Sequence, residues 1–210
     1  INNSLSNGII FMFLIGMFAN WANVPINIFV ITLTVIGLII SCVAVIVLKN
    51  MIMEFGKKEN KIQEVIAVLI SYCTIFNFMY IEDMYFVESI VMALSLLLFT
   101  YSANIIVNNK KLKNRIIALI LAIIGIIAYQ GTAGFLIILT FVISLLTNKV
   151  ELRGNKDKIK TNIRQILLDT VMAGIITAIA IVINMILVKV IGNITGQVQT
   201  RVGSIFAIFE

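Results

Sequence analysis

The sequence contains no histidine among its 210 residues. This absence excludes an imidazole general base, a histidine-coordinated zinc site and a Ser-His-Asp triad. Charge is also scarce, because only 12% of the residues are Asp, Glu, Lys or Arg, against about 25% in soluble globular domains. Together with a mean hydropathy of +1.08, this composition argues against a water-soluble enzyme.

Cysteine is nearly absent as well, with Cys42 and Cys73 as the only two. Both lie inside apolar runs, where free thiols commonly serve as small core residues. We therefore expect both side chains in the core, expect no disulfide, and infer no redox compartment from them.

Long uncharged runs make up most of the chain. A helix needs roughly 20 apolar residues to cross a hydrocarbon core of about 30 Å. The runs are continuous and lack the alternation of a β-barrel strand. We therefore predict an all-α, polytopic helical membrane protein with a single transmembrane domain over residues 1–210. The uncharged runs are residues 1–48, 65–81, 89–109, 116–148 and 170–188.

Basic residues gather in three loops, which predict the orientation of the chain. Fourteen of the 16 Lys and Arg residues lie in 49–61, 110–115 and 149–164, and the net charge is +6. The positive-inside rule places these loops in the cytoplasm, so an even number of crossings separates each consecutive pair. The excess of basic residues thus indicates membrane topology and not a nucleic-acid partner.

These constraints predict six spans, with a seventh possible. Residues 116–148 are too long for one span, and parity divides them at Tyr129–Gly134, where two glycines and polar side chains favour a turn. Residues 1–26 are expected to form an interfacial segment on the outer face or a partial span, and residues 192–210 an outer segment. The predicted spans are about 27–48, 64–80, 87–107, 116–129, 133–147 and 168–191.

The tip of the first predicted hairpin carries acidic residues that topology does not explain. Glu82, Asp83 and Glu88 lie on the outer side, where the only other acid is the last residue of the chain. In a helix over 82–88, Tyr85 lies on the face between the two glutamates. Glu88 falls about one turn inside the membrane boundary, where a carboxylate is costly and indicates function. A solvated outer loop is the alternative, above all for Asp83.

The second predicted hairpin tip places Tyr129 and Gln130 on the same outer side. An aromatic ring beside an amide is a pairing that sugar-binding sites often use, because the ring covers the pyranose and the amide bonds its hydroxyl groups. We therefore predict both residues to bind substrate, with a satisfied turn as the alternative.

The residues of these two tips resemble the pattern of the bacterial O-antigen-type glucosyltransferase II family. That pattern has an acid after a span, an aromatic residue, a second acid followed by Ser, and a Met-Ala-Leu-like apolar helix. A Tyr-Gln pair that ends a short span follows later in the chain. The matching residues here are Glu82, Tyr85, Glu88, Ser89, Met92, Ala93, Leu94, Tyr129 and Gln130.

Two positions depart from the family pattern. Asp83 replaces the usual Asn and Glu88 replaces the usual Asp, so neither change removes a carboxylate. The resemblance covers about residues 27–150 and implies a GT-C-like membrane glycosyltransferase with no metal and no cofactor. The catalytic base of the family is expected in a first outer loop that does not appear after Ile1. We therefore expect this chain to be a fragment of a longer protein.

The resemblance also implies a reaction, a location and partners. A sugar, expected to be glucose, moves from a polyprenyl-phosphate carrier to an envelope polysaccharide on the outer face of the bacterial cytoplasmic membrane. The partners are the lipid-linked donor, the polysaccharide acceptor and the bilayer. A transporter or flippase of envelope precursors and a non-enzymatic membrane scaffold are the alternatives. The candidate catalytic residues are Glu82 and Glu88, and the candidate substrate-binding residues are Asp83, Tyr85, Ser89, Tyr129 and Gln130.

Overall fold

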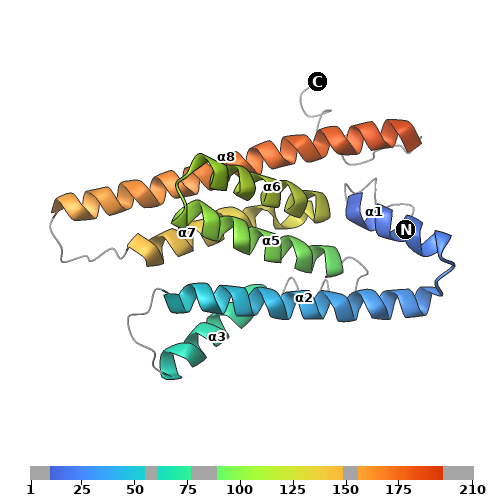
Figure 1. The fold of residues 1–210 in the computed structure, drawn as a ribbon, viewed down its shortest axis with the longest axis horizontal. Coiled ribbons are helices and arrows are strands. Elements are labelled where there is room, and N and C mark those ends of the chain that lie inside the picture. The colour runs from blue at the N-terminus through green and yellow to red at the C-terminus, as the bar shows by residue number, and fades with distance from the viewer. Residues whose placement is uncertain (1–9, 55–60, 77–88, 149–155, 196–210) are drawn as a thin grey trace.

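The computed structural model describes residues 10–54, 61–76, 89–148 and 156–195. Within these ranges the chain forms seven α-helices and one short 3-10 helix, and no strand. Figure 1 shows an elongated bundle in which α5, α6 and α7 lie between α2 and α8. The elements are α1 (Ile10–Trp21), α2 (Ile26–Glu54), α3 (Lys61–Ile75), α5 (Ser89–Asn108), α6 (Leu112–Ala128), η1 (Gln130–Thr132), α7 (Ala133–Asn148) and α8 (Lys156–Thr195).

Four helical segments are long and apolar enough to cross a membrane, namely α2, α5, Gln130–Asn148 and Asn162–Ile194 of α8. Large apolar side chains also cover the outside of these helices, which is unfavourable in water and suits contact with lipid. The described part of the chain is therefore all-α, with helices typical of a membrane protein, as the composition predicted. On α2 the exposed apolar side chains include Ile28, Ile31, Val35, Ile39 and Ile46.

The α1–α2 hairpin turns at Asn23, which has a left-handed φ of 50°. The Val24 N–H donates to the Ala19 carbonyl at 3.1 Å, and the Asn23 N–H donates to the Asn20 carbonyl at 3.2 Å. This pair of bonds is the Schellman motif that commonly ends a helix. Pro25 follows, and because it lacks an N–H it suits the start of α2 better than a continuation of α1.

The short helix α1 packs as part of the bundle, between α2 and α8 (Figure 1). Ala19 shares an apolar cluster with Phe29 and Leu33 of α2, and Ile10 packs with Val188 of α8. A helix of 12 residues is about 18 Å long, which is less than the thickness of a bilayer core. Contacts with α2, α6 and α8 hold this segment beside the N-terminal half of α2.

Two helix boundaries bear on the predicted spans. α6 ends at Ala128 and α7 begins at Ala133, with η1 between them, so the helix breaks within the segment where a turn was predicted. α8 runs unbroken for 40 residues and begins well before the predicted start at 168. The sequence of this extension contains Lys156, Lys158, Lys160 and Arg164.

Close contacts at two glycines determine where α5 packs. A Cβ atom on Gly37 of α2 would lie 3.2 Å from the Ile90 Cα, and one on Gly125 of α6 would lie 2.6 Å from the Phe99 Cε1. Phe99 has no exposed surface, so its ring has little room to move. Small residues allow this close approach between membrane helices, and α5 is therefore held tightly between α2 and α6.

The two cysteines are free and exposed, Cys42 on α2 and Cys73 on α3. The expectation that they are core residues was wrong. Lipid-facing surfaces of membrane helices are as apolar as their buried surfaces, so a position inside an apolar run does not tell burial from lipid exposure.

Candidate functional site

The predicted site residues that the structure describes gather at one end of the bundle. Ser89, Tyr129 and Gln130 lie where α5 begins and where α6 passes into α7, and we call this region the Tyr129 end. The opposite region, where α5 passes into α6, is the Lys110 end. The predicted site residues outside the described ranges are Glu82, Asp83, Tyr85 and Glu88.

Ser89 is the first residue of α5 and is 1% exposed. A Cβ on Gly37 would lie 3.4 Å from the Ser89 carbonyl carbon, so α2 packs closely against this helix start. Within the described part of the chain the Ser89 hydroxyl has no hydrogen-bond partner. A buried hydroxyl without a partner is unusual and needs a physical explanation.

Hydrogen bonds to its backbone N–H and carbonyl hold Tyr129 in place. Its N–H donates to the Gly125 carbonyl at 2.9 Å, which closes the end of α6. Its carbonyl accepts the Thr132 hydroxyl at 3.0 Å and the Ser95 hydroxyl at 3.4 Å. The two hydroxyl oxygens are 2.6 Å apart. Ser95 of α5 therefore joins the turn to the central helix and fixes the path of the backbone on either side of Gln130.

The Tyr129 ring lies against Gly131. A Cβ atom at Gly131 would come within 2.6 Å of the Tyr129 Cε1 and 3.3 Å of its hydroxyl oxygen. Only glycine therefore leaves the ring in this position without a shift. The turn predicted from its glycines thus has a specific function in the structure, which is to place an aromatic ring over its own backbone.

Gln130 meets a residue that the sequence analysis did not single out. The Asn184 Nδ2 on α8 donates to the Gln130 Oε1 at 3.4 Å, which is long for a hydrogen bond of this type. Asn184 is 1% exposed, and its Oδ1 has no partner among the described residues. Asn184 is the only amide side chain in the uncharged run 170–188, and this isolation is the signal in the sequence that could have identified it.

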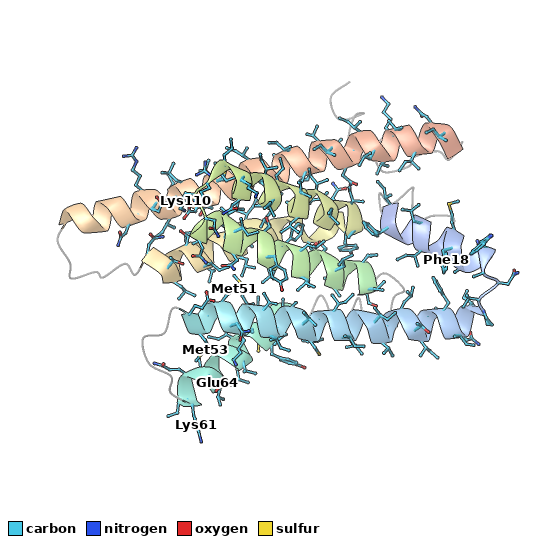
Figure 2. The ribbon with its side chains drawn as sticks, viewed as in Figure 1. Phe18, Met51, Met53, Lys61, Glu64 and Lys110 are labelled. Carbon is cyan, nitrogen blue, oxygen red and sulfur yellow. The ribbon has the colours of Figure 1, made fainter. Side chains whose placement is uncertain are left out.

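A second polar cluster, also missed from the sequence, occupies the Lys110 end. The Asp169 side chain on α8 is 5% exposed and pairs with Lys110 at 2.5 Å. Its other oxygen accepts the Ser144 hydroxyl of α7 at 2.9 Å, and Gln165 donates to the first oxygen at 2.8 Å. The Lys110 side chain is 44% exposed, so it pairs with the buried carboxylate from the surface of the bundle, far from Lys61 on α3 (Figure 2).

Three donors from three parts of the chain therefore satisfy the Asp169 carboxylate. A buried charge is tolerated when it is paired and hydrogen-bonded in this way. The arrangement ties α7, α8 and the α5–α6 connection together, and each oxygen of the Asp169 carboxylate has at least one donor. It is suited to holding helices in place.

The described residues hold no group of three or more His, Cys, Asp or Glu side chains that would bind a metal ion. Comparisons of the chain with protein-family models, with curated proteins and with solved structures found no match.

Proposed function

We propose that this protein is a membrane glycosyltransferase. It transfers a sugar, expected to be glucose, from a polyprenyl-phosphate carrier to an envelope polysaccharide, on the outer face of the bacterial cytoplasmic membrane. The observation that carries the proposal is the Tyr129 end, where an aromatic ring and two amides lie together.

The chemistry of this end supports a sugar as the ligand. Amides both donate and accept hydrogen bonds, which matches the hydroxyl groups of a sugar. The tyrosine ring adds an apolar face. Ser95 and Thr132 hold the backbone on both sides of Gln130, and such preorganisation lowers the cost of ordering a binding group.

In the proposed reaction an acidic residue of the 82–88 segment is the general base. Glu82 or Glu88 accepts the proton of an acceptor hydroxyl, and the freed oxygen attacks the anomeric carbon of the donor sugar. The bond between that carbon and the carrier phosphate breaks, and polyprenyl phosphate leaves with the electron pair. Asp83, Tyr85 and Ser89 complete the proposed substrate contacts with Tyr129 and Gln130.

The proposal includes a GT-C-like arrangement of six spans. The four long apolar segments supply four of them, and α3 and α6 supply the others. With 15 and 17 residues, these two helices measure about 22 and 26 Å, so each requires a locally thinner bilayer or flanking residues that complete the crossing.

Sugar transfer in membranes tests the proposal. Membranes that contain the full-length protein would receive polyprenyl-phosphate glucose with a radioactive sugar, and label in polysaccharide would be counted. We expect the Glu88→Gln or the Glu82→Gln variant to transfer about 100-fold more slowly, because loss of a general base has an effect of this size. Glu64→Gln is the matched control, since Glu64 pairs with Lys49 near the opposite end of the bundle (Figure 2).

Two outcomes would contradict the proposal. Full activity in both glutamine variants would remove Glu82 and Glu88 from the site, and absence of transfer from any lipid-linked sugar would remove the enzymatic function. If the protein instead moved labelled lipid-linked sugar across vesicle membranes without transfer, a flippase would be the better description.

A further inference from the structure

The side-chain amide of Asn184 is a buried polar group that lacks part of its hydrogen bonding. It is 1% exposed and lies on α8, a helix that otherwise buries mainly apolar residues at this level. It makes one long bond to Gln130, and its Oδ1 has no partner among the described residues. Leaving such an atom unpaired costs free energy, so native proteins rarely retain one without a reason.

Another buried polar side chain of the same helix behaves differently. Thr177 lies two turns before Asn184 and is 4% exposed, but its hydroxyl donates to the Ala173 carbonyl at 2.8 Å. Thr177 is thus satisfied by its own helix. Asn184 is directed at Gln130 instead, across the interface between α8 and the α6–α7 turn, where a third group would complete the pair.

The chemistry of the missing partner follows from the amide. The unpaired atom is an acceptor, so the partner must bring an O–H or N–H donor. A hydroxyl both donates and accepts, and therefore satisfies an amide in either of its two possible orientations. A phosphate or another anion that only accepts does not satisfy Oδ1.

Of the two amides, Gln130 is the one that reaches the surface, on the side of the turn, while Asn184 is 1% exposed behind it. Gln130 and Tyr129 are half-buried, and Gly131 and Gly134 are exposed. A Cβ atom on Gly134 would meet no atom within 4 Å among its described surroundings. The start of α7 is therefore exposed at Gly134, four residues after the half-buried Gln130.

We propose that Asn184 and Gln130 together bind a hydroxyl group of the transferred sugar. Asn184 thereby becomes a substrate-binding residue contributed by α8, in addition to those predicted from the sequence. This inference rests on the proposed function for the identity of the ligand as a sugar, while the need for a hydroxyl comes from the geometry of the amide pair.

Thermal unfolding of the full-length protein in lipid nanodiscs tests the inference. The probes are octyl β-glucoside below its micelle concentration and, at the same concentration, octyl phosphate, which has an equal chain and an anionic headgroup. The variants are Asn184→Leu, which removes the amide at similar volume, Gln130→Met, and Thr177→Val as the matched control. Sugar transfer is measured on the same samples.

We expect the glucoside to raise the unfolding midpoint of the wild type and of Thr177→Val by about 3 °C. Octyl phosphate should raise it by less. Asn184→Leu and Gln130→Met should lose the glucoside shift and transfer sugar about tenfold more slowly, the effect of losing one hydrogen bond to substrate. Without a probe, Asn184→Leu should unfold at or above the wild-type midpoint, because it removes an unpaired polar atom.

Three results would overturn the inference: an undiminished glucoside shift in Asn184→Leu, a lower midpoint of that variant without a probe, or a larger shift from octyl phosphate. Failure of the proposed function is a separate result. If the wild type transferred no sugar but its glucoside shift still depended on Asn184, the hydroxyl site would stand and the transferase function would fall.

Discussion

The two ends of the bundle bury polar groups in different ways. At the Lys110 end, Asp169 receives hydrogen bonds from Lys110, Ser144 and Gln165. At the Tyr129 end, Asn184 makes one long bond, and within the described part of the chain the Ser89 hydroxyl makes none. The charged Asp169 carboxylate thus has more hydrogen bonds than the neutral Asn184 amide or Ser89 hydroxyl.

This difference separates a structural cluster from a candidate binding site. A buried charge without partners would destabilise the fold, and the chain supplies all three donors itself, from the α5–α6 connection, α7 and α8. Burying a neutral amide or hydroxyl without a partner costs less free energy, so the fold tolerates such a group unpaired until a ligand binds it. Substitutions at the Lys110 end should therefore lower stability more than activity. Substitutions at the Tyr129 end should lower activity more than stability.

The largest expected effect on stability is at the Lys110 end. Lys110→Met leaves the Asp169 carboxylate buried without its cation and should lower the free energy of unfolding by about 3 kcal/mol. Denaturant titration in mixed micelles, followed by circular dichroism, measures this change. The Lys110→Met/Asp169→Leu double variant removes both charges and should recover stability to within about 1 kcal/mol of the wild type. A double variant as unstable as the single one would show that the pair is not the cause.

A smaller effect is expected where α6 approaches α5 below the Tyr129 end. Gly125→Ala places a Cβ atom 2.6 Å from the buried Phe99 ring and should cost about 2 kcal/mol through overpacking. Gly174→Ala on α8, where a Cβ meets nothing within 4 Å, is the matched control and should change stability by less than about 0.5 kcal/mol. Equal stabilities of the two variants would contradict the tight α5–α6 contact.

The smallest effect is expected at the exposed pair between α2 and α3. Lys49 and Glu64 are 2.7 Å apart, with side chains 24% and 52% exposed. Lys49→Met should leave the free energy of unfolding close to the wild-type value, because exposed ion pairs contribute little. The same titration measures it, and a loss close to that of Lys110→Met would remove burial as the explanation for the difference between the two pairs.

Much of the helix layout could be predicted from the sequence, because charge-free runs and basic loops directly reflect the requirements of a membrane. The turn at 129–134 followed from its glycines and from parity. Both cysteines were misplaced, since an apolar run looks the same on a lipid-facing and on a buried surface. The 40-residue length of α8 was also missed, because basic residues were taken to end the span.

The polar contacts were harder to predict. Tyr129 and Gln130 were predicted as an aromatic–amide pair. Their hydrogen-bond partners, Ser95 and Asn184, are 34 and 54 residues away from them in the sequence. The Asp169 cluster likewise joins positions up to 59 residues apart. Such pairings depend on which helix faces meet, and spacing along one sequence does not contain that information.

The most direct test compares sugar transfer per folded molecule at the two ends. Wild type, Asn184→Leu and the Lys110→Met/Asp169→Leu double variant would be assayed with polyprenyl-phosphate glucose at equal amounts of folded protein. We expect the double variant to transfer sugar at the wild-type rate and Asn184→Leu to be about tenfold slower. Full activity in Asn184→Leu with loss of transfer in the double variant would contradict the assignment of binding to the Tyr129 end and of structure to the Lys110 end.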